Sequence, residues 1–270
     1  MQKAVSDIRD ILFEKIRNKK ITAKILVEKE GIIAGTTKAG EKLEGLGLSI
    51  SFLATEGLIV SPGMEVARFT GTPKEITSAE DIVIGNLTKA SGIATAAHRA
   101  VDLASGRIRI VSGAWKKMPI EIKEMVREAV KTGGASFRIT DDPFVYLDKN
   151  YVRIFGGIKA TLEAVSKLSG YTKVIQLRGE TAAISEEAEQ AVLGGADILM
   201  VDTGCLEDAL QVINKLKSMS VRDKKLLAFA GGINIADIPV YCEHGFDILD
   251  IGVQIIDAPL LDMKMDVISI

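Results

Sequence analysis

The 270-residue sequence contains only two cysteines, Cys205 and Cys242, and only two histidines, His98 and His244. The cysteines lack the spacing of a zinc site and are too few for a disulfide framework, so we expect both to be buried free thiols. Two histidines also leave little material for a Ser-His-Asp or Cys-His arrangement. These scarcities argue against a structural zinc centre and against hydrolases that use such groups.

Long hydrophobic runs are also missing. The first 20 residues, MQKAVSDIRDILFEKIRNKK, are charged throughout, unlike a secretory signal peptide. No apolar stretch approaches the roughly 20 residues needed to cross a bilayer. With 34 basic and 36 acidic residues the net charge is −2, which favours neither nucleic acid nor a membrane as a partner. We therefore expect a soluble, cytoplasmic protein whose ligands are small molecules.

The sequence has an ordinary globular composition, but its two halves differ in pattern. Short strand-like pieces divided by Gly and Pro occupy residues 21–75, and a helical pattern with Ser78 at its start covers residues 78–104. Gly92, inside this helix, is expected to let another backbone pack closely. We expect an N-terminal α/β sandwich over residues 1–104, with the C-terminal tail 257–270 packing on it.

From residue 105 to 256, strand-like and helix-like segments alternate. The strands are apolar runs such as DILMVD and KLLAFAGG, which is typical of parallel strands covered on both faces. Such alternation predicts a parallel α/β fold, with about six visible units. We prefer an incomplete α/β barrel to a doubly wound sheet, because no G-x-G-x-x-G fingerprint occurs early in the chain.

Glycines end the last two strands of this series. Gly231 and Gly232 follow the strand LLAFA, and Gly252 follows the strand DILDI. In α/β barrels the last two strand-to-helix loops often bind phosphate, and glycine gives an anion access to backbone N–H groups. A tight turn with positive φ would also explain each glycine. We prefer phosphate binding, because two successive strands end in the same way.

Charged side chains follow the two preceding strands. Asp202 ends the apolar strand ILMVD, where it would bind Mg²⁺, accept hydrogen bonds from sugar hydroxyls or cap the next helix. The strand KVIQLRGE brings Arg178 and Glu180 to the same edge. An arginine directed inward among carboxylates requires a partner or an anionic ligand, whereas one at the strand end is simply solvated.

Basic side chains also lie at the start of the series. Lys116 and Lys117 follow the only tryptophan, Trp115, in SGAWKKMP. Two lysines at the edge of a sheet are either solvated or form a local positive patch for phosphate or pyrophosphate. The next segment, GGASFRITDDPFVYLDKN, adds Arg138 and Lys149.

One ordered set of segments spans both halves of the chain. It consists of EGIIAG, LTKASGIATAAHRAVD, AVKTGGASFR, GGADILMVDTG, AFAGGI and ILDIGV. In this order they resemble the quinolinate phosphoribosyltransferase family. The resemblance implies an N-terminal α/β sandwich followed by an open α/β barrel of about seven parallel strands. It also implies a homodimer, or a multiple of dimers, whose active site includes residues of the neighbour's N-terminal domain.

The family transfers the phosphoribosyl group of phosphoribosyl pyrophosphate to the ring nitrogen of quinolinate, with Mg²⁺, in NAD biosynthesis. The resemblance implies that Lys116, Arg138 and Asp202 are catalytic, with Asp202 also a Mg²⁺ ligand. It assigns phosphate binding to the glycines Gly231, Gly232 and Gly252. The further substrate-binding candidates are Trp115, Lys117, Phe137, Lys149, Arg178, Glu180 and, as a weaker match to a basic position, Arg99.

Departures from the family concentrate where it binds the pyridine dicarboxylate. Trp115 replaces an arginine, Phe137 replaces a histidine, and Asp148 lies where a lysine is expected. Each charge-assisted hydrogen bond contributes about 1.5–3 kcal/mol, so losing such groups weakens the binding of a dianion. We therefore expect a phosphoribosyltransferase with an altered acceptor pocket, in which Trp115 and Phe137 stack on a flatter, less charged ring.

Two alternatives stay open. In the first, the chain is a quinolinate enzyme in which Lys117, Arg138 and Lys149 substitute for the missing cations. In the second, it is a non-catalytic paralogue that binds a phosphosugar or nucleotide as a sensor or partner subunit. Gln176 and Arg178, on the strand where the family has two glutamates, favour the second alternative. The retained catalytic residues argue against it.

Overall fold

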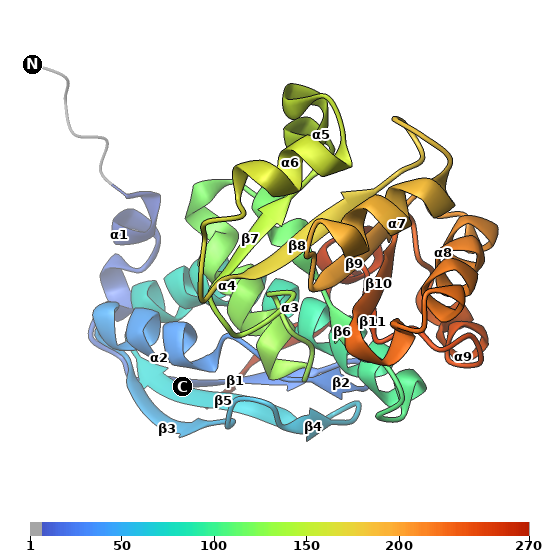
Figure 1. Cartoon of the computed structure of the whole chain (residues 1–270). Helices are drawn as coiled ribbons and strands as arrows, with labels where there is room; N and C mark the ends of the chain where they lie inside the picture. Colours follow the sequence, from blue (N-terminus) through green and yellow to red (C-terminus); the bar gives the residue numbers. More distant parts are fainter. Residues whose placement is uncertain (1–6, 270) are drawn as a thin grey trace, which may run out of the picture. The chain divides into compact units, whose positions relative to one another are not determined.

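The computed structural model describes residues 7–269 and divides the chain into two compact units (Figure 1). The first unit contains the chain up to His98, the segment Pro119–Gly134 and the residues from Asp257 onward. The second contains Arg99–Met118 and Ala135–Ile256. The units thus interleave along the chain, and the domain boundary at residue 104 stays a prediction.

The first unit is built on an antiparallel sheet with the strand order β12-β1-β5-β3, and β2 and β4 form a separate pair. Its strands are β1 (Ile21–Val27), β2 (Gly31–Ile32), β3 (Ser49–Leu53), β4 (Ile59–Val60), β5 (Glu65–Gly71) and β12 (Met263–Ser269). Its helices are α1 (Ile8–Leu12), η1 (Glu14–Ile16), α2 (Thr36–Gly45), α4 (Ile120–Thr132) and most of α3 (Pro73–Ala104).

Alternation of side chains explains how this sheet buries one face. In β1, the residues Ile21, Ala23, Ile25 and Val27 are buried and those between them are half-buried. They share a core with Phe69 of β5 and with apolar side chains of α2 and α3. The N-terminal α/β sandwich expected from the sequence is therefore confirmed.

Helix α3 begins at Pro73, five residues before the start expected at Ser78. The backbone N–H of Thr72 donates to Glu75 Oε2 at 2.7 Å, and that of Glu75 donates to Thr72 Oγ1 at 3.4 Å. This reciprocal pair is a capping box, and Pro73 occupies the first helical position, where its missing N–H matters least. The TPKE sequence carried this signal.

The predicted close approach at Gly92 is present. A Cβ on Gly92 would lie 2.1 Å from the carbonyl oxygen of Pro259, which no side chain tolerates. The segment after Pro259 continues into β12, which pairs with β1 in antiparallel fashion. Gly92 therefore lets the C-terminal segment run directly along α3.

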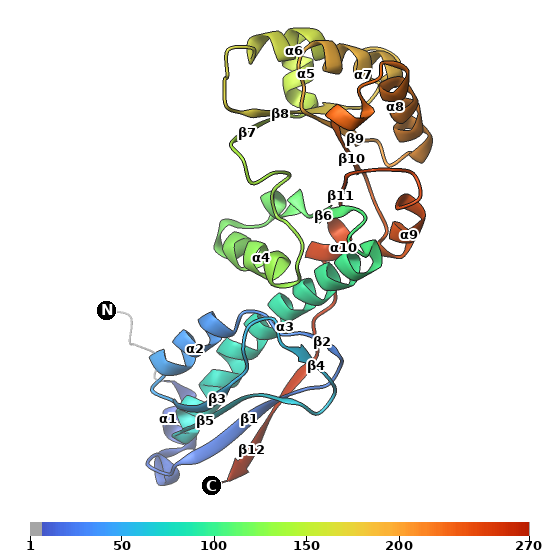
Figure 2. The same cartoon turned by 60° about the horizontal axis from the view of Figure 1, so that its bottom comes forward.

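The second unit is built on six parallel strands in the order β6-β11-β10-β9-β8-β7 (Figure 2). The strands are β6 (Arg109–Val111), β7 (Phe144–Leu147), β8 (Thr172–Leu177), β9 (Ile198–Asp202), β10 (Leu226–Ala230) and β11 (Ile248–Asp250). The helices are η2 (Gly113–Lys117), α5 (Lys149–Phe155), α6 (Ile158–Ala164), α7 (Ile184–Leu193), α8 (Leu206–Ser218), η3 (Arg222–Lys224), η4 (Ile235–Asp237), α9 (Ile238–Tyr241) and α10 (Val253–Ile256).

This sheet confirms the expected open α/β barrel. Strands β8, β9 and β10 are each buried along four consecutive residues, as expected for strands covered on both faces. The expected strand ASFRI is reduced to one parallel bridge between Val111 and Ser136. Within residues 7–269 the sheet therefore has six strands rather than about seven. The open side of the barrel lies between the Val111–Ser136 bridge and β7.

Two further expectations concern the two cysteines and the crossing of a membrane. Cys205 is exposed and Cys242 is only partly buried, so the prediction of two buried thiols was wrong. Cys205 precedes α8 in the loop after β9, where Gly204 is exposed as well. Among the helices of residues 7–269, none is both long and apolar enough for a transmembrane span.

Candidate functional site

A cavity of about 520 Å³ opens at the carboxyl ends of the parallel strands in the second unit. Parallel strands direct their following loops to one edge of the sheet, so side chains distant in sequence meet there. Most of the predicted site residues line this cavity: Trp115, Lys116, Lys117, Phe137, Arg138, Asp202, Gly231, Gly232 and Gly252. Arg99, Lys149, Arg178 and Glu180 do not line it.

Glycine occurs at Gly231 and at Gly232 for two different structural reasons. Gly231 packs against the chain after β9, since a Cβ on it would lie 2.4 Å from the backbone nitrogen of Gly204. Gly232 has φ +74° and no atom within 4 Å of where its Cβ would be. Within residues 7–269, the N–H groups of Gly232 and Gly252 donate no backbone hydrogen bond. These donors at the cavity wall are suited to an anion.

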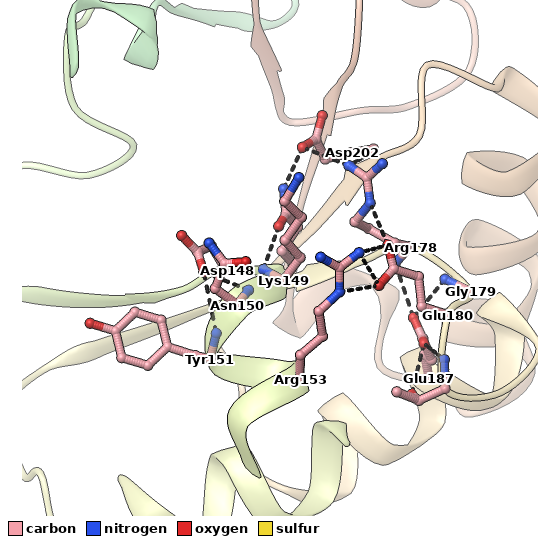
Figure 3. Close-up of polar contacts among 12 residues, drawn as sticks. Asp148, Lys149, Asn150, Tyr151, Arg153, Arg178, Gly179, Glu180, Glu187 and Asp202 are labelled. Atoms are coloured by element: carbon pink, nitrogen blue, oxygen red, sulfur yellow. Dashed lines mark hydrogen bonds and ion pairs between the residues drawn. The ribbon is translucent and has the colours of Figure 1, made fainter. Parts of the chain in front are cut away.

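Asp202 is held by Gln176 of β8 and by Arg178, which directly follows β8, as Figure 3 shows for Arg178. Gln176 donates its amide N–H to Asp202 Oδ2, and Arg178 Nη1 donates to Asp202 O at 2.6 Å and to Oδ2 at 3.2 Å. Burial raises the pKa of Asp202, while the cations of Arg178, Lys149 and Lys117 act in the opposite direction. The second oxygen, Oδ1, accepts no hydrogen bond from the described residues.

The orientation of Gln176 is fixed from its other side. Its Oε1 accepts a hydrogen bond from the backbone N–H of Lys149 at 2.6 Å, so its Nε2 must face Asp202. Lys149 itself is exposed at the start of α5. Asp148, which stands where the family has a lysine, caps that helix by accepting from the N–H of Asn150 at 2.8 Å. This is a structural role for Asp148.

Glu180, Arg178 and Arg153 form a charge network (Figure 3). Glu180 accepts from Arg153 Nε at 2.8 Å and from Arg178 Nε at 3.2 Å. The hydrogen bond from Arg153 and the neighbouring guanidinium groups lower the pKa of Glu180. Arg178 is thus paired with carboxylates on both sides and is not a simply solvated residue.

The two aromatic departures from the family contact each other. The rings of Trp115 and Phe137 meet edge to face with centroids 6.3 Å apart, and Trp115 Nε1 donates to the carbonyl oxygen of Phe137 at 2.7 Å. The indole N–H is therefore occupied in joining the two loops. Both residues line the cavity with aromatic side chains, where the family has cationic ones.

Lys116 and Arg138 also lie against aromatic rings. Lys116 Nζ is 4.6 Å from the ring centroid of Tyr146, and the guanidinium carbon of Arg138 is 5.1 Å from that of Phe144. Arg138 further donates long hydrogen bonds to carbonyl oxygens of its own loop. These cation–π contacts hold both cations at the cavity without neutralising them.

Sequence reasoning missed three polar side chains of the cavity, Asp250, Tyr146 and Gln254. Asp250 ends the apolar strand β11 just as Asp202 ends β9, so the signal that singled out Asp202 was present for it. Tyr146 carried no signal that separates it from a core aromatic residue. Its burial, with the nearby carboxylates Asp250, Asp202 and Asp148, raises the pKa of Tyr146.

The donors at the cavity fit Mg²⁺ only in part. No group of three or more His, Cys, Asp or Glu side chains in the described part of the chain forms a metal cage. Mg²⁺ commonly takes one or two carboxylates and fills its octahedron with water and substrate phosphate. Asp202, with Oδ1 open, fits that role for a metal ion that arrives with a phosphorylated substrate.

Domain models of one protein family match both the N-terminal and the C-terminal part of the chain. The model described as quinolinate phosphoribosyl transferase, C-terminal domain, matches residues 93–266, and that of the N-terminal domain matches residues 10–91. The probable nicotinate-nucleotide pyrophosphorylase (carboxylating) of Methanothermobacter thermautotrophicus is 25% identical over 255 residues, 93% of this chain and 90% of the relative. The human nicotinate-nucleotide pyrophosphorylase (carboxylating) is 26% identical over 246 residues, 90% of this chain and 81% of the relative.

Solved structures share the fold. The nicotinate-nucleotide pyrophosphorylase of Francisella tularensis superimposes with a TM-score of 0.82 at 22% identity, covering 99% of this chain and 92% of the other. Human nicotinic acid phosphoribosyltransferase gives a TM-score of 0.73 at 11% identity, with 98% and 74% coverage. At these identities the likeness concerns the architecture.

Proposed function

Because this chain belongs to the quinolinate phosphoribosyltransferase family, we propose that it transfers the phosphoribosyl group of phosphoribosyl pyrophosphate to the ring nitrogen of a small aromatic acid. The reaction releases pyrophosphate and is of the type used in NAD biosynthesis. One observation carries the proposal: open backbone N–H groups at Gly232 and Gly252 line the same cavity as Lys116, Lys117 and Asp202.

Each group has a role that follows from its chemistry. The N–H groups of Gly232 and Gly252 bind the 5′-phosphate. Lys116 and Lys117 stabilise the negative charge that develops on the leaving pyrophosphate. Asp202 accepts a hydrogen bond from a ribose hydroxyl through Oδ1, and its charge favours the cationic ribosyl group of the transition state.

Asp202 would hold Mg²⁺, which would supply further positive charge at the leaving group. The residues of this chain contribute by positioning the charged groups. Gln176 and Arg178 hold the carboxylate of Asp202 in place, and the cation–π contact with Tyr146 holds Lys116.

The acceptor pocket is altered in our proposal. Trp115 and Phe137 line the cavity with aromatic side chains where cationic groups would bind a dicarboxylate. Arg138 is the cation left at that wall, and it serves a single carboxylate. An aromatic ring with fewer charges than quinolinate therefore suits the pocket better.

The test is pyrophosphate release from phosphoribosyl pyrophosphate with quinolinate, nicotinate and related aromatic acids. We expect phosphoribosyl pyrophosphate to bind in calorimetry and pyrophosphate to appear only when an acceptor is added. Lys116→Met should lower kcat/KM by about 100-fold or more, since it removes a charge from the leaving-group site. Lys131→Met, at an exposed lysine of α4, is the matched control and should change nothing. A protein that does not bind phosphoribosyl pyrophosphate contradicts the proposal.

A second candidate function rests on the pairing of Asp202 with Arg178. An arginine that occupies the ribose-side carboxylate favours a non-catalytic paralogue that binds a phosphosugar or nucleotide as a sensor. That candidate predicts calorimetric binding of phosphoribosyl pyrophosphate without pyrophosphate release for any acceptor. The two functions therefore separate in the same experiment.

A further inference from the structure

Asp250 is a carboxylate of the cavity to which the proposed function gives no role. It ends β11, where it is in register with Ala230 of β10, which is in turn in register with Asp202 of β9. On the other side it is in register with Val111 of β6. Ala230 and Val111 both belong to the apolar core inside the sheet, so Asp250 is directed into the barrel with them.

The carboxylate of Asp250 lies against the loop that carries the acceptor wall. Its Oδ1 accepts a hydrogen bond from the backbone N–H of Gly113 at 2.9 Å. A Cβ on Gly113 would lie 3.0 Å from Oδ2, so glycine at this position lets the carboxylate approach. Gly113 begins η2, which continues directly into Trp115 and Lys116. Oδ2 accepts no hydrogen bond from the described residues.

The surroundings of Asp250 suit a flat ring that donates hydrogen bonds. Trp115, Phe137 and Tyr146 line the same cavity as Asp250 and give it aromatic side chains. A pyridine dicarboxylate would place its anionic groups near this half-buried carboxylate, which like-charge repulsion disfavours. A ring N–H, in contrast, would give Oδ2 the donor that it lacks.

We propose that the phosphoribosyl acceptor is a planar N–H heterocycle with at most one carboxylate, and that Asp250 Oδ2 accepts its ring proton. This inference rests on the proposed function and names its substrate class. As the ring nitrogen forms its bond to C1′, the bond from C1′ to the pyrophosphate oxygen breaks, and pyrophosphate leaves with the electron pair. The N–H proton moves to Asp250, which later releases it to water. The product is a neutral N-riboside ring, with no oxidant or reductant involved.

The electrostatic setting of Asp250 is compatible with a base. Burial raises the pKa of Asp250, the hydrogen bond from Gly113 opposes this, and the nearby Asp202 adds to the rise. Lys116 and Lys117 of η2 lower the pKa, and Tyr146 of β7 faces the same carboxylates. A carboxyl with a raised pKa is a stronger proton acceptor than an exposed one.

The experiment compares ring acceptors that carry an N–H proton with acceptors that lack one. Pyrophosphate release is measured with benzimidazole, imidazole-4-carboxylate, orotate and hypoxanthine, with quinolinate and nicotinate as N–H-free acids, and with 1-methylbenzimidazole as the matched control. We expect at least one N–H acceptor to be used, and its N-methyl counterpart to be used at least 100-fold less well. Asp250→Asn keeps the acceptor for Gly113 and should lower kcat with that substrate by about 100-fold or more.

Two controls separate a catalytic role from a structural one. The acidic limb of the pH profile of kcat should be present in the parent protein and absent in Asp250→Asn, while binding of phosphoribosyl pyrophosphate stays unchanged. Asp223→Asn, at an exposed residue of η3, should behave as the parent protein.

The inference is overturned if phosphoribosyl pyrophosphate binds but no N–H acceptor of the panel releases pyrophosphate. It is equally overturned if quinolinate is a good substrate and Asp250→Asn turns it over normally. Both outcomes leave the proposed function standing. Failure to bind phosphoribosyl pyrophosphate would instead remove the proposed function itself.

Discussion

Asp202 has donors of two kinds on one oxygen, the amide of Gln176 and the guanidinium of Arg178. Gln176 is buried, with 7% of its surface exposed, and its amide bridges the backbone N–H of Lys149 to that carboxylate. A carboxylate at position 176 would accept from Lys149 equally well but would repel Asp202. The amide therefore gives Asp202 a hydrogen-bond donor that an ionised carboxylate at position 176 would not give.

Gln176→Glu tests this arrangement. Burial and the charge of Asp202 would raise the pKa of the introduced carboxyl above its unfolded value, so its ionisation opposes folding. We expect the free energy of unfolding to fall by about 1–3 kcal/mol at pH 7. The loss should shrink as the pH decreases through that raised pKa, because the protonated group again donates to Asp202. Denaturant unfolding at several pH values measures it, with Gln211→Glu at an exposed position of α8 as control.

Glu187 organises the loop that follows β8. Its carboxylate accepts from the backbone N–H groups of Arg178, Gly179 and Thr181, at 3.0, 2.8 and 2.9 Å, and from the Thr181 hydroxyl at 2.8 Å (Figure 3). Glu187 is buried, with 1% of its surface exposed. This buried acceptor fixes the backbone from which Arg178 reaches Asp202.

Glu187→Ala should therefore lower the free energy of unfolding by about 3 kcal/mol, since several loop N–H groups lose their acceptor. Glu186→Ala, one residue earlier in α7 and exposed, should change it by no more than about 0.5 kcal/mol. Chemical denaturation compares the two variants. Equal stabilities would show that the carboxylate of Glu187 does not hold the loop.

At the scale of elements, α3 contains two glycines with opposite environments. Gly92 lies under the carbonyl of Pro259, whereas Gly85 is exposed, with no atom within 4 Å of the place that a Cβ would occupy. Glycine inside a helix normally costs stability relative to alanine. Only at Gly92 does a close backbone contact compensate for that cost.

Opposite outcomes follow for the two alanine substitutions. Gly92→Ala should lower the free energy of unfolding by about 1–3 kcal/mol, because the methyl group displaces the C-terminal segment. Gly85→Ala should raise it by about 0.5–1 kcal/mol through helix propensity alone. Thermal unfolding of the two variants is a direct comparison, and a stabilised Gly92→Ala would contradict the packing described for α3.

At the scale of the whole molecule, each unit carries exposed apolar side chains on a helix. In the first unit, Ile8, Ile11 and Leu12 of α1 are 63%, 64% and 67% exposed. In the second unit, Ile154 of α5 is 76% exposed. Neighbouring apolar side chains of this kind are typical of surfaces that a partner covers. The homodimer that the family resemblance implies stays a prediction, and these side chains are candidates for its interface.

We expect light scattering to give twice the 29.0 kDa mass of one chain. Ile11→Asp should shift the protein toward the monomer, because it places a charge within the apolar side chains of α1. Asp223→Asn, at an exposed residue of η3 in the second unit, serves as the control. A parent protein that sediments as a monomer at all concentrations would refute the dimer.

Hydrophobic periodicity and the positions of glycine and proline were enough to predict much of the architecture. The continuous apolar runs of β8, β9 and β10 indicated a parallel sheet correctly, and the family resemblance supplied the N-terminal sandwich. The segment ASFRI failed, because its strand character depends on a neighbour that pairs with it along only one residue, Ser136. Local propensity cannot report such pairing.

The sequence by itself determined that carboxylates, lysines and glycines follow successive strands, because a residue's position at a strand end is a local property. Only the tertiary structure decided which of these groups meet. It turned Arg178 toward Asp202 and Glu180, gave Asp148 to a helix cap, and brought Asp250 beside Gly113. Register between strands and the hydrogen bonds available across them fix such contacts, and both depend on residues far apart in the chain.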